Sequence, residues 1–182
     1  INMPIITKGS RFLSSKNIND WKQEQAVNFD SLFIINQIAI KNMKKKKIKG
    51  RIINITTISA KHNSTKKSSG TDILTKNMVE KYTQMMAEEH YNDGIGLVVV
   101  RLDEKIGSST FDKIKLNLPN QASGILNAFK SFDMFVNASP KSVIPLILYC
   151  IRSPFHEITG KVVSSKAFKT DNNLSKVVPS HN

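Results

Sequence analysis

The stretch "GTDILTKNMVEKYTQMMAEEHYNDGIGLVVVRLD", Gly70 to Asp103, decides the fold of this 182-residue chain. Its first half predicts a helix over residues 72–90, because apolar side chains recur along one face. These side chains are Leu74, Met78, Tyr82, Met85 and Met86. The segment "NDGIG" then turns the chain, and the apolar run "IGLVVVRL" predicts a buried strand.

A second predicted strand lies upstream of this helix. The segment "RIINIT", Arg51 to Thr56, is β-branched and continuous, as expected for a parallel strand that is buried on both faces. The polar segment Ser59 to Gly70 predicts a loop. Strand, helix and strand in this order predict a right-handed crossover unit of a parallel sheet.

A long helix is predicted before the first strand, starting near Trp21 with Asn19 or Asp20 as its cap. Its second half is apolar almost all round, so we expect it to be buried on more than one side. The apolar positions are Val27, Leu32, Phe33, Ile34, Ile35, Ile38 and Ala39. The basic run Lys44 to Lys47 ends the helix, where cations complement its dipole.

The C-terminal part predicts the remaining elements of an α/β domain. Short helices are expected over residues 111–116 and 122–132, a helix over 140–152, and a last strand over "ITGKVVSS", residues 158–165. The predicted fold class is a Rossmann-like, three-layer α/β fold with a parallel sheet flanked by helices. We expect the domain to span residues 1–165, and residues 166–182 to form a polar tail.

Composition narrows the classes of function. The formal net charge is +13, which favours either a polyanionic partner or simple lysine enrichment. The second interpretation is preferred, because the basic residues are spread along the chain. No apolar run approaches the 18–20 residues, roughly, that a membrane span needs. The single cysteine, Cys150, excludes an internal disulfide and favours a buried thiol in a reducing cytoplasmic or organellar compartment.

No metal site is predicted. The four histidines, His62, His90, His156 and His181, are scattered and lack the spacing of ligands.

Four segments in this order resemble the short-chain dehydrogenase/reductase family. They are "DWKQEQAVNFDSLFIINQIAI" (20–40), "GRIINITTISA" (50–60), "DILTKNMVEKYTQMMAEE" (72–89) and "HEITGKVVSS" (156–165). The resemblance covers about residues 1–165, but only the C-terminal two-thirds of the family fold. It implies a nicotinamide cofactor, NAD or NADP, and a catalytic set of tyrosine, lysine, serine and asparagine.

The resemblance assigns a position to each member of that set. Asn28 matches the asparagine that holds a relay water, Lys76 matches the lysine, and Thr57 stands where the serine is expected. Asp72 replaces the tyrosine, four residues before Lys76. Asn2 and Lys76 are the implied cofactor-binding residues.

Asp72 is the departure that matters most. The family's tyrosine donates or accepts a proton, and a lysine tunes it toward working pH. A carboxylate beside an ammonium group is ionised at neutral pH and has no proton to give. We therefore interpret Asp72 as a carboxylate at the N-terminus of a helix, where it caps free N–H groups.

The cofactor side departs as well. None of the eight glycines forms the G-x-x-x-G-x-G turn that cradles a pyrophosphate. The family's Asn-Ala-Gly step is matched by Asn2-Met3-Pro4, and its Pro-Gly step by Leu102-Asp103. The nucleotide-binding part is thus either missing or outside the printed sequence, and the start on Ile1 favours the second alternative.

Three hypotheses for function remain open. The first is a catalytically degenerate member of the family, kept as a structural or binding subunit of a homo- or hetero-oligomer. In that case the helices over 21–43 and 72–90 are expected to form the contacts between subunits. The second is an active NAD(P)-dependent reductase of 3-oxoacyl or ketone substrates. The third is a basic structural protein of an organellar ribonucleoprotein, which the net charge alone motivates.

Overall fold

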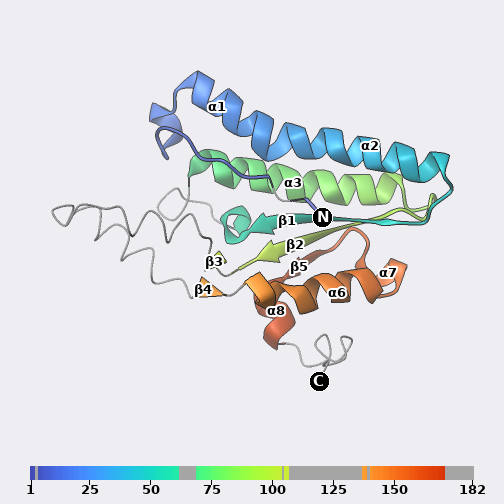
Figure 1. The fold of residues 1–182 in the computed structure, drawn as a ribbon. Helices are drawn as coiled ribbons and strands as arrows, with labels where there is room; N and C mark the ends of the chain where they lie inside the picture. Colours follow the sequence, from blue (N-terminus) through green and yellow to red (C-terminus); the bar gives the residue numbers. More distant parts are fainter. Residues whose placement is uncertain (3, 62–68, 104, 107–136, 139, 171–182) are drawn as a thin grey trace.

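A three-stranded parallel sheet lies at the centre of the molecule (Figure 1). The computed structural model describes residues 1–2, 4–61, 69–103, 105–106, 137–138 and 140–170. The strands are ordered β1 (Arg51–Thr57), β2 (Gly96–Leu102) and β5 (Val162–Ser164). Arg51 pairs with Gly96, and Val99 pairs with Val162, each in parallel register. Both apolar runs predicted as strands therefore pair as neighbours, which confirms the α/β fold.

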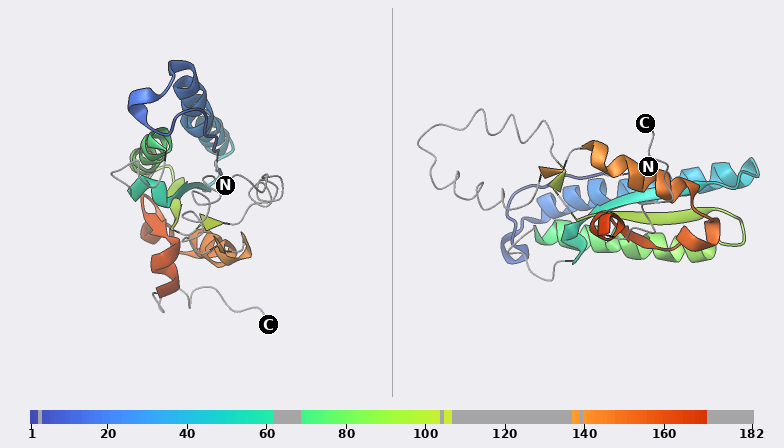
Figure 2. Two further views of the ribbon diagram at one scale, coloured as in Figure 1. Left: turned by 90° about the vertical axis from the view of Figure 1, so that its left-hand side faces the viewer. Right: turned by 90° about the horizontal axis from the view of Figure 1, so that it is seen from below.

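Helices cover both faces of this sheet. The helices α1 (Ile18–Gln25), α2 (Ser31–Lys45) and α3 (Gly70–Glu89) lie on one side. The helices α6 (Ile144–Arg152), α7 (Phe155–Ile158) and α8 (Ser165–Thr170) lie on the other, as Figure 1 and the left view of Figure 2 show. Short elements complete the described chain: η1 (Leu13–Ser15), η3 (Ile58–Lys61), β3 (Lys105–Ile106), β4 (Asn137–Ala138) and η4 (Pro140–Val143). The three layers match the Rossmann-like prediction.

The long N-terminal helix begins earlier than predicted. Asn17 is its cap, because the Asn17 side chain accepts a hydrogen bond of 2.8 Å from the backbone N–H of Asn19. The prediction of Asn19 or Asp20 as the cap is therefore wrong. A π-helical turn, η2 (Ala26–Asp30), joins α1 to α2 without a break. The basic run ends α2 as expected, and Lys47 adopts a positive φ of 54° at that end.

The last predicted strand is much shorter in the structure. Only Val162 to Ser164 form β5, while Ile158 ends α7 and Gly160 turns the chain at a φ of 75°. Glycine tolerates this left-handed conformation because it has no Cβ. After β5 the chain forms α8, which lies beyond the expected domain boundary at residue 165 and buries Phe168. The helices predicted over 111–116 and 122–132 fall outside the described residues.

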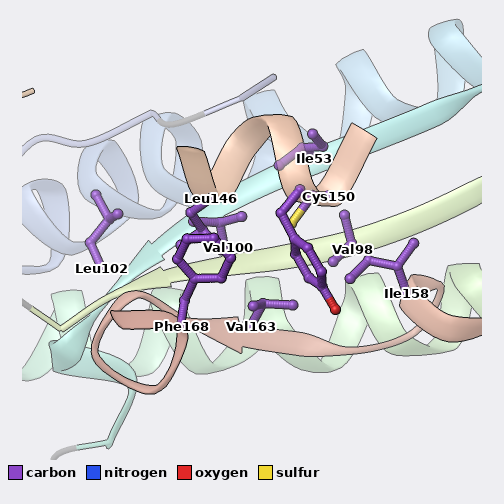
Figure 3. Packing of buried hydrophobic residues seen from close by; sticks show 10 residues of the cluster. Ile53, Val98, Val100, Leu102, Leu146, Cys150, Ile158, Val163 and Phe168 are labelled. Atoms are coloured by element: carbon purple, nitrogen blue, oxygen red, sulfur yellow. The ribbon is translucent and has the colours of Figure 1, made fainter. Parts of the chain in front are cut away.

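The hydrophobic core lies mainly between the sheet and the helices α6 and α8 (Figure 3). Val98 and Val100 of β2 face Leu146 and Cys150 of α6 in this cluster. Cys150 is fully buried, and burial raises the pKa of its thiol to about 12. The thiol is therefore protonated and serves as a small apolar group, as predicted.

The helix α2 is less buried than its composition predicted. Leu32, Asn36 and Ile40 are its buried side chains. The side chains of Ile34 and Ile38 are 53% and 55% exposed. The expectation that α2 is buried on more than one side is thus wrong within this chain. Only one stripe of α2 turns inward, so its second apolar stripe remains on the surface.

Candidate active site

The candidate site lies at the carboxyl end of the sheet, where β1 ends and α3 begins. In open α/β sheets, ligands bind outside the carboxyl ends of the strands. Thr57 is the last residue of β1, and Asp72 lies in the first turn of α3. Because α3 begins at Gly70, two residues earlier than predicted, Asp72 is inside the helix and not at its cap position.

Asp72 and Lys76 are both buried on the inner face of α3. The spacing of four residues places both on one side of the helix, which is the side that packs on the sheet. Asp72 is 9% exposed and Lys76 is 0% exposed. Burial lowers the pKa of the Lys76 ammonium, and the charge of Asp72 partly opposes that effect. The spacing thus places both side chains on one face of α3, with a carboxylate where the resemblance implies a phenol.

The Lys76 ammonium is already used within the protein. Its Nζ donates a hydrogen bond of 2.9 Å to the backbone carbonyl of Pro4. By contrast, Asp72 Oδ1 is buried and has no hydrogen-bond partner among the described residues. The lysine therefore ties the N-terminal segment to α3, while one carboxylate oxygen of Asp72 is left unsatisfied.

Asn28 lies in the π-helical turn η2, a kind of turn that is frequent at functional sites. Its amide is also fully engaged by the N-terminal segment. Asn28 Oδ1 accepts a hydrogen bond of 2.6 Å from the backbone N–H of Ile6. Asn28 Nδ2 donates one of 2.9 Å to the carbonyl of Ile6. Asn28 thus fixes the backbone of this segment.

Asn2 and Thr57 complete the predicted set. Asn2 extends the sheet by one parallel bridge, since its N–H donates to the Ile53 carbonyl at 3.0 Å. The Asn2 amide donates to Asn36 Oδ1 at 2.9 Å. Within the described part of the chain, Thr57 Oγ1 is buried and has no hydrogen-bond partner. Asn2 therefore lies in the N-terminal segment, and Asn28 and Lys76 both form hydrogen bonds to that segment. The Thr57 hydroxyl has no partner among the described residues.

Sequence reasoning missed a third attachment of the same segment. Glu24 is fully buried, and its Oε1 accepts hydrogen bonds from the backbone N–H of Lys8 and, at 3.0 Å, from Lys16 Nζ. Lys76, Asn28 and Glu24 thus hold residues 4, 6 and 8, which alternate along an extended chain. A signal for Glu24 was present, because it lies one turn before Asn28 on the same helix.

Asp103, noted only as a departure from Pro-Gly, organises the carboxyl end of β2. Its carboxylate accepts hydrogen bonds from Ser164 Oγ and from the Lys166 N–H, and it pairs with Lys61 at 3.3 Å. Burial acts to raise the pKa of Asp103, but these hydrogen bonds and the Lys61 charge outweigh it, and the net pKa is lowered. A carboxylate thus links three elements at this edge.

No tyrosine replaces the missing phenol. The chain has three tyrosines, and each packs against phenylalanine: Tyr82 against Phe29 and Phe33, Tyr91 against Phe155, and Tyr149 against Phe168. In the described part of the chain, the hydrogen bond of the Lys76 ammonium goes to a carbonyl and not to a phenol.

In the described part of the chain, the residues that the resemblance assigns to the cofactor bond to the protein itself. Lys76 is fully buried against the Pro4 carbonyl, and the amides of Asn2 and Asn28 are bonded to the protein. We therefore derive no reaction step through this cofactor.

The described residues contain neither a cluster of metal ligands nor a helix that could span a membrane. Among them, no group of three or more His, Cys, Asp or Glu side chains could hold a metal ion. Within the same residues, no helix combines the length and apolar character that crossing a membrane requires.

Comparison with known proteins decides the family. The family model described as short chain dehydrogenase matches residues 5–103, more than half of the chain. The chain belongs to the short-chain dehydrogenase family. Its family match includes α1, β1, α3 and β2, and so all of Asn28, Thr57, Asp72 and Lys76.

Solved structures support the fold of this family member. One similar structure is described as ElxO with NADP bound, at 21% identity and a TM-score of 0.72, covering 93% of this chain and 66% of that one. Another is 4-hydroxyisoleucine dehydrogenase complexed with NADH, at 19% identity and a TM-score of 0.67, covering 88% and 63%. A third is a short chain dehydrogenase from Leptospira borgpetersenii with bound NAD+, at 16% identity and a TM-score of 0.69, covering 90% and 61%.

The chain thus spans between 61% and 66% of the length of these three structures. A search of curated proteins found no match.

Proposed function

We propose that this family member does not reduce ketones and is retained as a structural or binding subunit of a larger assembly. The observation that carries the proposal is Asp72, a buried carboxylate one helical turn before Lys76, where the family's resemblance implies a tyrosine. General acid catalysis needs a group that holds a proton near working pH. The phenol that the resemblance implies as the proton donor is therefore absent from this position.

The contact of Lys76 supports the same proposal. A catalytic lysine tunes its partner by presenting a charge to the site. Here the ammonium donates to the Pro4 carbonyl and is inaccessible to solvent. Lys76 therefore serves the packing of the N-terminal segment.

Turnover tests the catalytic half of the proposal. We expect no reduction of 3-oxoacyl thioesters or simple ketones by the chain with NADH or NADPH, followed by loss of nicotinamide absorbance. Asp72→Tyr supplies a phenol, and Asp72→Asn is the matched control that removes the charge alone. A positioned acid contributes about 10²–10⁴-fold to a rate, so activity confined to Asp72→Tyr would show that the remaining site is intact. Turnover by the unmodified chain would contradict the proposal and favour an active NAD(P)-dependent reductase.

Exposed apolar side chains support the assembly half of the proposal. On α2, the side chains of Ile34, Ile35 and Ile38 are about half exposed. On α3, those of Leu74 and Met85 are 41% and 53% exposed. Both helices lie in the same layer (Figure 1). Contiguous apolar patches on soluble proteins mark interaction sites. These two helices therefore offer the surface through which a subunit of a homo- or hetero-oligomer would pack.

Oligomeric state tests this surface. We expect Ile38→Glu to dissociate the assembly, lowering the molar mass measured by light scattering after size exclusion, because a buried unpaired charge is costly. Ile144→Glu is the matched control, since Ile144 is 53% exposed on α6, in the opposite layer, against 55% for Ile38. A monomeric wild-type chain, or equal dissociation by both variants, would contradict the role of α2.

A further inference from the structure

The end of the molecule where β1 begins carries a dense cluster of positive charge. Between residues 41 and 51 the sequence has seven basic residues and no acidic one. Six of them are exposed lysines: Lys41, Lys44, Lys45, Lys46, Lys47 and Lys49. Lys41, Lys44 and Lys45 lie in the last turns of α2, and the other three follow its end. The helix α2 ends at the right-hand side of Figure 1. We call these six lysines the basic cluster.

Acidic neighbours offset part of this charge but not all of it. Asp93 pairs with Lys44 at 2.7 Å and with His90 at 2.8 Å. Glu88 and Glu89 are exposed at the end of α3, and the exposed Glu157 lies next to His156. Against these four carboxylates the same end adds the exposed Arg152 and Lys161 to the basic cluster. The surface therefore keeps a net positive charge.

Aliphatic side chains stand among the lysines on this surface. Ile48 follows the positive-φ turn at Lys47, and Ile151 lies in the last turn of α6; each is 49% exposed. The start of β1 is joined to the end of α6, because Arg51 donates a hydrogen bond of 2.6 Å to the Cys150 carbonyl. Lys49 and Ile151 also line one shared hollow, together with Ile1, Gly50, Arg51 and Ile53. Charge and apolar surface are thus contiguous.

We propose that this end of the molecule docks on the surface of an anionic lipid membrane, with the basic cluster on the headgroups and Ile48 and Ile151 in the boundary region. Clusters of four to eight lysines or arginines, roughly, bind anionic lipids by charge attraction. Exposed aliphatic groups add apolar burial at the headgroup boundary, while long lysine side chains keep their ammonium groups at the surface. Basic charge paired with aliphatic groups fits a bilayer better than RNA, since single-stranded RNA is bound by aromatic stacking.

Vesicle flotation tests this docking with the 182-residue chain. We expect binding to vesicles that mix phosphatidylserine with phosphatidylcholine and none to phosphatidylcholine alone. Binding will fall as salt rises from about 0.1 M to about 1 M, because the Debye length shrinks from about 10 Å to about 3 Å. Equal binding to both kinds of vesicle would overturn the proposal.

Two sets of variants localise the effect. Lys45→Gln, Lys46→Gln and Lys47→Gln combined are expected to weaken vesicle binding on the order of 100-fold. The matched control replaces three exposed lysines elsewhere, Lys22, Lys81 and Lys166, and should change it by less than about threefold. Circular dichroism melting verifies that both triple variants are folded. Equal losses in the two sets would show a nonspecific charge effect and overturn the proposal.

The aliphatic pair separates lipid from nucleic acid. We expect Ile48→Ser with Ile151→Ser to weaken vesicle binding while the salt dependence stays unchanged, because the charge is intact. Gel-shift titration with mixed-sequence single-stranded RNA is the competing measurement. Tight RNA binding that the serine pair leaves unchanged, with no vesicle binding, would replace the membrane by an RNA partner.

Discussion

Glu80→Ala will destabilise the fold by about 3–5 kcal/mol, because it leaves the Arg101 guanidinium buried without its partner. The side chains of Glu80 and Arg101 are only 11% and 16% exposed. Glu80 Oε1 accepts hydrogen bonds of 2.8 Å from both Arg101 Nε and Thr56 Oγ1, and Oε2 accepts one from Arg101 Nη2. The hydrogen bonds that Glu80 accepts raise the pKa of Arg101, although burial acts to lower it. The pair joins α3 to β1 and β2, so its loss loosens the layer that carries Lys76.

The urea midpoint measures this loss, and a double variant provides its control. Glu80→Leu combined with Arg101→Leu removes both charges, and well-packed replacements of a buried pair are often neutral or stabilising. We therefore expect the double variant to be more stable than Glu80→Ala. A native urea midpoint for Glu80→Ala would show that the pair is solvated and contributes little.

Phe168→Ala will cost about 3–5 kcal/mol, the usual range for emptying a buried phenylalanine site. Phe168 projects from α8 into the main core, where its ring centroid lies 5.4 Å from that of Tyr149 (Figure 3). A domain has a total stability of only about 5–15 kcal/mol, so this loss is a large fraction of it. Thermal unfolding followed by circular dichroism will show a clear fall in Tm.

Lys166→Ala is the control for this prediction. The Lys166 side chain is exposed on the same helix, and only its backbone N–H bonds to Asp103. The Lys166→Ala variant should therefore unfold at the wild-type temperature. A Tm for Phe168→Ala equal to that of the control would mean that α8 is not part of the cooperative unit, in agreement with a domain boundary at residue 165.

The strands and the main helix were predictable because their signals are local. A continuous β-branched run such as "RIINIT" excludes an amphipathic helix and favours a strand with two buried faces. The crossover rule then fixes the parallel pairing of β1 with β2. The length of β5 was overestimated from the sequence. Only the backbone turn at Gly160 and the start of α8 show where the strand begins and ends.

Part of the site was also predictable from spacing. Four residues separate Asp72 from Lys76, and helical periodicity alone places them on one face. The partners of these groups were not predictable. Pro4, Ile6 and Lys8 lie far from Lys76, Asn28 and Glu24 in sequence, and no local pattern encodes hydrogen bonds over such separations.

The sequence by itself determined the α/β class, the parallel unit of β1 and β2, and the loss of the family's phenol at Asp72, since each depends on residue type and short-range period. Tertiary structure alone decided which polar side chains form hydrogen bonds within the protein. Lys76 and Asn28 hold the N-terminal segment because a buried donor or acceptor must find a partner, and the nearest partners there are backbone groups. It also decided that the isoleucines of α2 face outward, since one helix can turn only one stripe toward a single sheet.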